Sequence, residues 1–154
     1  MKPLLAFLVL LVSIPAIPLR AADELVFSEL SSEKSKEQRA AFSDWISGDD
    51  FEIHFEEQKQ KGKFLLYVEG NGKSEYRGIF GDVEPSGWYY TYGSSEEAFF
   101  DSHRRYTANG LKLMTLTKSR SDRYGAIWIS ERSFAAVSAQ LAKYGISLAS
   151  VSKN

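Results

Sequence analysis

Residues 101–103, with the sequence Asp-Ser-His, are the first to suggest chemistry, because a hydrolytic triad uses these three residue types. If the segment is helical, neighbouring side chains point about 100° apart and cannot converge on one substrate atom. Alignment with the helix predicted around Phe55 places His103 on the inner, apolar face instead. We therefore expect His103 to be a structural histidine, and the sequence predicts no catalytic residues.

Metal ligands are equally scarce. The chain has no cysteine and only two histidines, which excludes thiolate sites and leaves little for a zinc site built on imidazoles. His54 stands near Glu56 and Glu57, but one histidine with two surface carboxylates is a poor set of ligands. The sequence predicts no metal and no cofactor. Without cysteines there is no disulfide framework, so stability must come from packing.

The aromatic run Trp88, Tyr89, Tyr90 and Tyr92 is the candidate for ligand binding. On a strand, alternate side chains share a face, so Trp88, Tyr90 and Tyr92 would lie together with Tyr89 opposite. If exposed, the three aligned rings would suit stacking on sugar rings or on an extended peptide. If buried, they would be core residues that stabilise the fold. The sequence leaves both interpretations open.

The second half of the chain is locally basic. This cluster could receive an acidic partner or a glycan, or it could consist of ordinary exposed turn and helix residues. Its members are Arg104, Arg105, Lys112, Lys118, Arg120 and Arg123.

An internal repeat predicts the elements that would position these residues. Residues 62–80 align without a gap with residues 110–128, and the pattern Trp-Ile-Ser before a phenylalanine occurs at both 45–51 and 128–134. Each unit reads as helix, strand, turn and strand, with repeats at about 45–80, 93–128 and 128–151. The residues that define the repeat are Ser47, Phe51, Gly62, Tyr76, Ser95, Phe99, Gly110, Tyr124, Trp128, Ser130, Phe134 and Gly145.

Each recurring residue type has a mechanical reason. The serines stand where a helix would begin, so their side-chain oxygens should accept hydrogen bonds from the first free backbone N–H groups. The phenylalanines begin an apolar face with helical spacing. The glycines end each helix, where the chain enters the left-handed region. We therefore predict an α+β fold, an antiparallel sheet with helices on one face, built from two and a half tandem helix–strand–turn–strand repeats.

The segment RYGAIW at 123–128, preceded by GLKLMTL and followed by a helix, a glycine and a strand, resembles the bacterial tandem repeat domain of polyglycine-hydrolase-like proteins. The likeness covers roughly residues 45–151. Lys112 stands where the family often has arginine, and Leu111 replaces its usual tyrosine. The resemblance implies a repeat fold. In those hydrolases peptide cleavage belongs to a separate serine β-lactamase-like domain, so the resemblance does not bring the activity to this chain.

That chemistry would need a Ser-x-x-Lys nucleophile with partner motifs. Two such strings occur, Ser31 to Lys34 and Ser150 to Lys153, and no Lys-Thr-Gly motif follows either one. The alternative function is nevertheless a serine-type hydrolase that acts on a glycine-rich peptide.

The N-terminus predicts export. Residues 1–22 combine Lys2, an apolar run and small residues before Asp23, as in a signal peptide, although an uncleaved anchor is the alternative. Residues 23–44 would then form a strand and a polar linker or helix, and residues 45–154 the tandem repeat domain. Without residues 1–22 the chain has 17 basic and 20 acidic residues, which does not suit nucleic-acid binding.

We therefore predict a secreted or periplasmic, non-catalytic interaction or scaffolding module. Its partner would be a glycan, a peptide or an envelope protein, and no segment would span a membrane once the signal is removed.

Overall fold

The computed structural model describes residues 23–31, 40–84 and 86–152, and within them each helix follows a serine. These helices are α2 (Gly48–Gln60), α3 (Glu96–Ala108) and α4 (Glu131–Lys143). The predicted caps are confirmed for two of them, because Ser47 accepts a hydrogen bond from the backbone of Asp50 and Ser95 from that of Ala98. The prediction is wrong for Ser130, which makes no side-chain cap. Its hydroxyl bonds to that of Ser86 at 2.8 Å instead, since the turn that contains Ser86 lies against it.

The glycine after each helix has a positive φ, as predicted. The angles are 72° at Gly62, 80° at Gly110 and 66° at Gly145. A side chain built on either of the first two glycines would meet nothing within 4 Å, so the backbone conformation alone favours glycine there.

The strands form three antiparallel sheets. β2 (Ile46–Ser47), β4 (Glu75–Gly81) and β3 (Phe64–Gly70) make one, in the order β2-β4-β3. β5 (Trp88–Ser94), β7 (Tyr124–Ser130) and β6 (Leu111–Lys118) make the second, in the order β5-β7-β6. β1 (Glu24–Val26) pairs with β8 (Ser150–Ser152), so both described ends of the chain meet in a ribbon. The predicted α+β class with antiparallel sheets is confirmed.

The two three-stranded sheets are joined along β3. Side chains of the second sheet donate hydrogen bonds to β3 carbonyl oxygens: Trp88 to Leu65 at 3.0 Å, and Thr117 to Val68 at 2.7 Å. Gly125 allows this approach, because a side chain there would meet the Val68 carbonyl at 3.1 Å. These contacts bring the turn after β3 beside the turn after β6.

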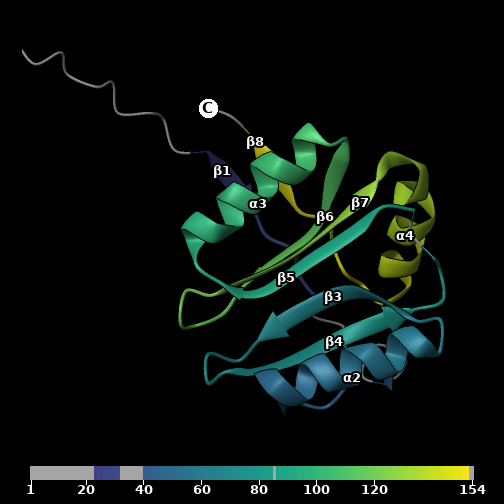
Figure 1. Cartoon of the computed structure of the whole chain (residues 1–154). Coiled ribbons are helices and arrows are strands. Elements are labelled where there is room, and N and C mark those ends of the chain that lie inside the picture. The colour runs from purple at the N-terminus through teal and green to yellow at the C-terminus, as the bar shows by residue number, and fades with distance from the viewer. Residues whose placement is uncertain (1–22, 32–39, 85, 153–154) are drawn as a thin grey trace, which may run out of the picture.

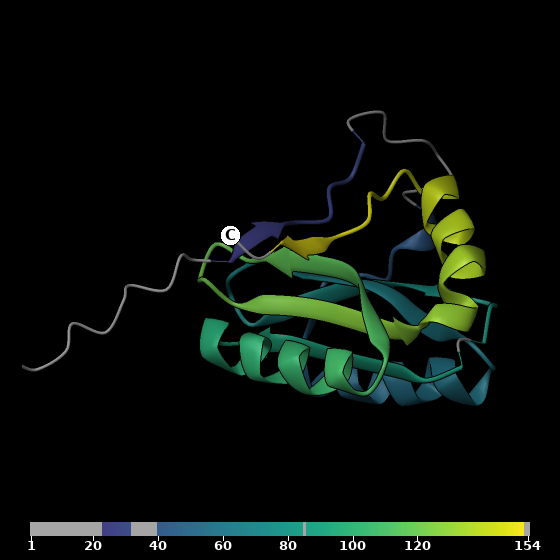
Figure 2. The ribbon, with the colours of Figure 1, turned by 90° about the horizontal axis from the view of Figure 1, so that it is seen from above.

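The helices cover the strands unequally (Figures 1 and 2). α2 and α3 lie on the same side of the strands, as predicted, and the β1–β8 ribbon lies on the other side. α4 differs from the prediction, because it stands across the ends of the strands. Its apolar residues Val137 and Leu141 are nevertheless buried, and they join the core cluster that lies beneath α2.

Two parts of the chain share local geometry and are called here the first unit (residues 47–81) and the second unit (residues 95–130). Each comprises a 13-residue helix and two strands. A fully buried phenylalanine, Phe51 or Phe99, lies under each helix. The strand register shifts between Leu65 and Tyr67 in the first unit and between Leu113 and Thr115, 48 residues later, in the second.

The third predicted copy departs from this geometry. Leu148 is 37% exposed, whereas Leu65, which likewise stands three residues after the glycine that ends a helix, is fully buried. Phe134 is only half-buried, with the Lys112 ammonium 5.7 Å from its ring centre. The reason is that β8 pairs with β1 and forms no hairpin of its own, so this segment does not pack as the hairpins do.

Candidate functional site

The aromatic residues of β5 alternate as predicted, but α2 covers the face that was expected to bind a ligand. Trp88, Tyr90 and Tyr92 are half-buried and pack against the core. The Phe55 ring centre lies 5.5 Å from that of Trp88 and 4.5 Å from that of Tyr90. On the opposite face the more exposed Tyr89 stacks on the Tyr106 ring. The three rings of the predicted site are thus packing residues along most of their surface.

The hydroxyl groups of Tyr90 and Tyr92 still lie near acidic side chains of α2. The Tyr92 hydroxyl donates a 2.7 Å hydrogen bond to Glu52. Burial, with added repulsion from Glu52 and Glu56, raises the pKa of Tyr90 to about 12. Burial, and then the hydrogen bond to Glu52 and the charge of Glu52, raise the pKa of Tyr92. Both rings therefore stay neutral well above the usual tyrosine range.

The Asp-Ser-His segment does not form a triad in the structure. His103 Nδ1 accepts a 3.2 Å hydrogen bond from the Trp128 indole, and its ring stacks on Phe99. Asp101 lies on the exposed side of α3, where it pairs with Arg104. His54 packs edge-on against the Phe80 ring. The described residues contain no group of three or more histidine, cysteine or acidic side chains that could hold a metal ion.

Half of the basic cluster is neutralised by acidic neighbours. Arg104 pairs with Asp101, Lys112 with Glu131, and Lys118 with Asp122 at 3.0 Å. Arg105 donates to the Tyr106 hydroxyl. The remaining members, Arg120 and Arg123, make no ion pair with any described residue. Both lie in the turn between β6 and β7.

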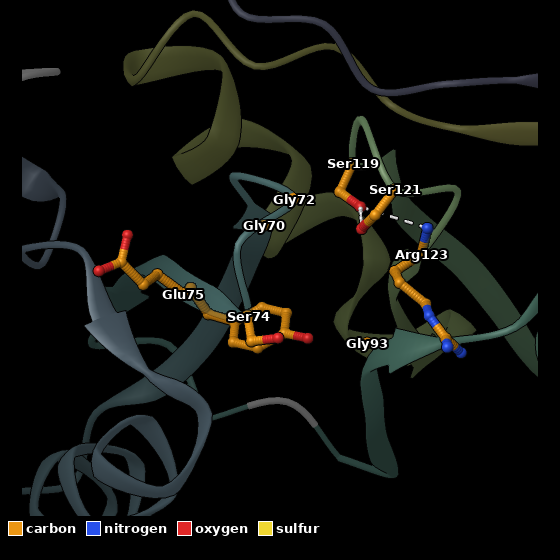
Figure 3. A pocket seen from close by; sticks show the side chains of 9 residues that line it. Gly70, Gly72, Ser74, Glu75, Gly93, Ser119, Ser121 and Arg123 are labelled. Carbon is orange, nitrogen blue, oxygen red and sulfur yellow. Dashed lines mark hydrogen bonds between the residues drawn. The ribbon is translucent and has the colours of Figure 1, made fainter.

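That turn and its counterpart between β3 and β4 enclose a cavity of about 490 Å³ (Figure 3). Ser119, Ser121 and Arg123 line it from one turn, and Ser74 faces them from the other. The side chain of Glu75 extends away from the cavity, and its carboxylate accepts a hydrogen bond from Asn71. The remaining lining residues are Gly70, Gly72, Tyr76 and Gly93.

A second cavity of about 580 Å³ shares Ser74, Tyr76 and Gly93 with the first and continues to the N-terminus of α2. Its other lining residues are Ser47, Gly48, Asp49, Glu52 and Tyr92. We call the two cavities together the hairpin groove. Each cavity lies within the range of about 300–1,000 Å³ that is typical of ligand sites.

A ring of glycines keeps the hairpin groove open around Tyr76. A side chain at Gly70 would meet the Tyr76 ring at 3.2 Å, and one at Gly48 would meet it at 3.5 Å. A side chain at Gly93, where φ is 65°, would collide with the Tyr76 hydroxyl. The glycines therefore bring three backbone segments against one half-buried ring, without side chains that would cover it.

The equivalent tyrosine of the second unit, Tyr124, is shielded from solvent. Tyr124 is only 2% exposed, and its hydroxyl donates a 2.9 Å hydrogen bond to Glu96, the first residue of α3. Burial, and then this hydrogen bond, raise the pKa of Tyr124. The first residue of α2 is Gly48, so Tyr76 has no such carboxylate, and its hydroxyl bonds to no described residue.

A third cavity, of about 620 Å³, lies on the other side of the turns. Its central polar groups bind one another: the Tyr67 hydroxyl donates to Glu69 at 2.9 Å, and Glu69 pairs with Arg77. These groups already have partners, although Arg120, which makes no ion pair with any described residue, also lines this cavity. The hairpin groove is the better candidate for a ligand site because its glycines leave the Tyr76 ring uncovered.

Sequence reasoning found only part of the hairpin groove. It singled out Ser47 and Tyr76 as repeat residues, Arg123 as part of the basic cluster and Tyr92 as part of the aromatic run, but it did not bring them together. The available signal was the alignment of the two units, which sets Gly48 against Glu96 at the helix starts and Lys73 against Ser121 in the turns.

No protein-family model, curated protein or solved structure matches the chain. No helix among the described residues is long and apolar enough to cross a membrane. The predicted signal peptide at 1–22 lies outside the described residues, as do Lys34 and Lys153 of the two Ser-x-x-Lys strings.

Proposed function

We propose that the chain is an exported, non-catalytic binding module that holds an extended glycan in the hairpin groove. The observation that carries this proposal is the pair of adjoining cavities around Tyr76, whose lining includes hydroxyl groups, carboxylates and one guanidinium. Serine hydroxyls donate and accept hydrogen bonds, and carboxylates accept them, so this lining suits a ligand rich in hydroxyl groups.

The lining favours a glycan over a peptide. Peptides are usually recognised by strand addition or by apolar grooves that take their side chains. The apolar surface of the first cavity is limited to the Tyr76 ring and glycines. Of the aromatic residues that the sequence predicts as ligand-binding, only Tyr92 lines the groove. Trp88 and Tyr90 serve it indirectly, by packing β5 against α2.

The fold would act as a rigid scaffold for this groove. If the two units are a tandem repeat, as the resemblance to the bacterial tandem repeat domain implies, the groove arises where their turns meet. Export to the periplasm or the medium would place it among envelope and extracellular glycans. No observation among the described residues favours the alternative of a serine-type hydrolase.

The proposal is tested by binding of the chain, without residues 1–22, to an array of oligosaccharides and oligopeptides. We expect binding to oligosaccharides, and its loss in Ser121→Trp, because the indole would fill the first cavity. Lys73→Trp is the matched control: it changes the equivalent exposed position of the other turn, which does not line the cavity. Equal binding by both variants would contradict the site.

The same incubations test the absence of catalysis. Chromatography of the oligosaccharides, and of pentaglycine, should show intact compounds after prolonged incubation. Release of fragments that Ser31→Ala or Ser150→Ala abolishes would support the hydrolase instead.

A further inference from the structure

We propose that the hairpin groove selects glycans that carry an isolated carboxylate between neutral sugars, and that Arg123 and the Tyr76 hydroxyl bind this carboxylate. The inference rests on the proposed function and specifies the ligand class of the same site.

Arg123 is the only basic residue that lines the described groove. Its guanidinium pairs with no described carboxylate, whereas three neighbours from the same basic cluster are paired. A guanidinium presents parallel N–H donors that match the two oxygens of a carboxylate. The charge of Arg123 is therefore available to a ligand.

The Tyr76 side chain also lines the first cavity, so its hydroxyl supplies a second donor. The comparison with the second unit supports its role, because Tyr124 uses the same hydroxyl to bind the carboxylate of Glu96. Since Gly48 replaces that glutamate, Tyr76 lacks an internal carboxylate. A ligand carboxylate in the groove would restore the missing interaction.

Hydrogen bonds within the turn between β6 and β7 hold the side of the cavity that carries Arg123. The Ser119 hydroxyl accepts a 3.2 Å hydrogen bond from the Arg123 backbone and lies 3.0 Å from the Ser121 hydroxyl. These bonds fix the turn from which the Arg123 side chain extends. Ser74 on the facing turn adds one more hydroxyl to the cavity.

The rest of the groove excludes a uniformly acidic chain. Asp49 and Glu52 line the second cavity, and the Glu52 carboxylate already accepts a hydrogen bond from the Tyr92 hydroxyl. Carboxylates at this end accept hydrogen bonds from sugar hydroxyls but repel further negative charge. The groove is thus positive at one end and negative at the other, which fits one carboxylate beside neutral rings.

The test compares two tetrasaccharides by calorimetry. One alternates glucuronic acid with N-acetylglucosamine, and in the other each carboxylate is reduced to a primary alcohol. We expect the acidic compound to bind about tenfold more tightly. Arg123→Gln should remove this difference, so that the acidic and the reduced compound bind with similar affinity. Arg120→Gln is the matched control, because Arg120 lies in the same turn outside the groove, and it should behave as the wild type.

Tyr76→Phe should narrow the preference for the acidic compound, and thermal melts of every variant would show that each is folded. Equal binding of both compounds, or a preference that survives Arg123→Gln, would overturn the carboxylate inference while leaving the glycan-binding function standing. Binding of neither compound, or of galacturonate tetramers in preference to both, would overturn the inference as well. Absence of binding to any oligosaccharide on the array would overturn the proposed function itself.

Discussion

The first and second units place a tyrosine in the same position and use it in opposite ways. Tyr124 is buried, and its hydroxyl binds Glu96 at the start of α3. Tyr76 is half-buried, faces Gly48 at the start of α2 and borders a groove. One change of residue type, glutamate to glycine, therefore accompanies the difference between a closed unit and an open one.

The hairpin turns of the two units also combine shared backbone features with different side chains. In both units a backbone N–H donates to the carbonyl oxygen four residues later, from Asn71 to Glu75 and from Ser119 to Arg123. Both turns hold a non-glycine residue at positive φ, 62° at Ser74 and 54° at Asp122. The turns differ in their side chains and at one backbone position, because Gly72 of the first turn has a φ of 85° and its equivalent Arg120 is not at positive φ.

The largest expected effect tests whether the two units stabilise the fold equally. Phe51→Ala and Phe99→Ala should each lower the free energy of unfolding by about 3–5 kcal/mol, because each removes a fully buried ring. Urea denaturation measures both. Ile53→Ala, at an exposed position of α2, is the control. A loss below about 1 kcal/mol for one phenylalanine alone would break the equivalence of the units.

The next effect concerns the glycines that end the helices. Gly62→Val and Gly110→Val should each destabilise by about 1–2 kcal/mol, because a β-branched residue tolerates positive φ badly. Both sites are open, so no collision adds to the cost. Asn at the same positions, which tolerates this conformation better, should cost less. Equal costs for Val and Asn would show that the conformation is not the cause.

The aromatic strand gives the fold a dependence on high pH. Since burial raises the pKa of Tyr90 to about 12, the unfolded chain loses this proton first, from about pH 10. The contribution of Tyr90 to the free energy of unfolding should therefore be constant below pH 10 and fall as the pH rises through 12. Denaturation between pH 9 and 12 checks this, and the free energy of unfolding of Tyr90→Phe should fall less steeply than that of the wild type. An unchanged slope in that variant would contradict the assignment.

The smallest effect separates the two tyrosines. Tyr124→Phe should cost about 1 kcal/mol, because it removes the hydrogen bond to Glu96. Tyr76→Phe should change stability by less than about 0.5 kcal/mol, since its hydroxyl has no described partner to lose. Thermal or urea denaturation of the pair gives the difference directly. Equal losses would mean that Tyr76 has an internal role.

Local signals in the sequence predicted most of the elements. Serine and glycine mark the helix ends through backbone hydrogen bonds and positive φ, both of which depend on a few neighbouring residues. The alternation of Trp88, Tyr89 and Tyr90 placed their side chains on the correct faces of β5. The predicted cap at Ser130 was wrong because its hydroxyl bonds to that of Ser86, and such a contact joins segments far apart in the chain.

The site depended on such distant contacts. Ser74 and Ser121 face one another only because β6 and β5 donate hydrogen bonds to β3 and so set the two hairpins side by side. No periodicity records that arrangement. Equally, the sequence could not show that α2 covers the aromatic face, because helix position depends on packing between Phe55 and the β5 rings.

The substitution Gly48→Glu closes the comparison, because it gives the first unit the carboxylate that the second unit has. A side chain at this position meets the Tyr76 ring at an ordinary contact distance of 3.5 Å, and an acidic residue suits the first turn of a helix. Binding of the alternating acidic tetrasaccharide should therefore fall at least about tenfold in Gly48→Glu with no loss of stability, while Gly48→Ala, which adds only a methyl group beside the ring, loses less affinity. Wild-type affinity in Gly48→Glu would contradict the claim that the open face of Tyr76 is the binding site.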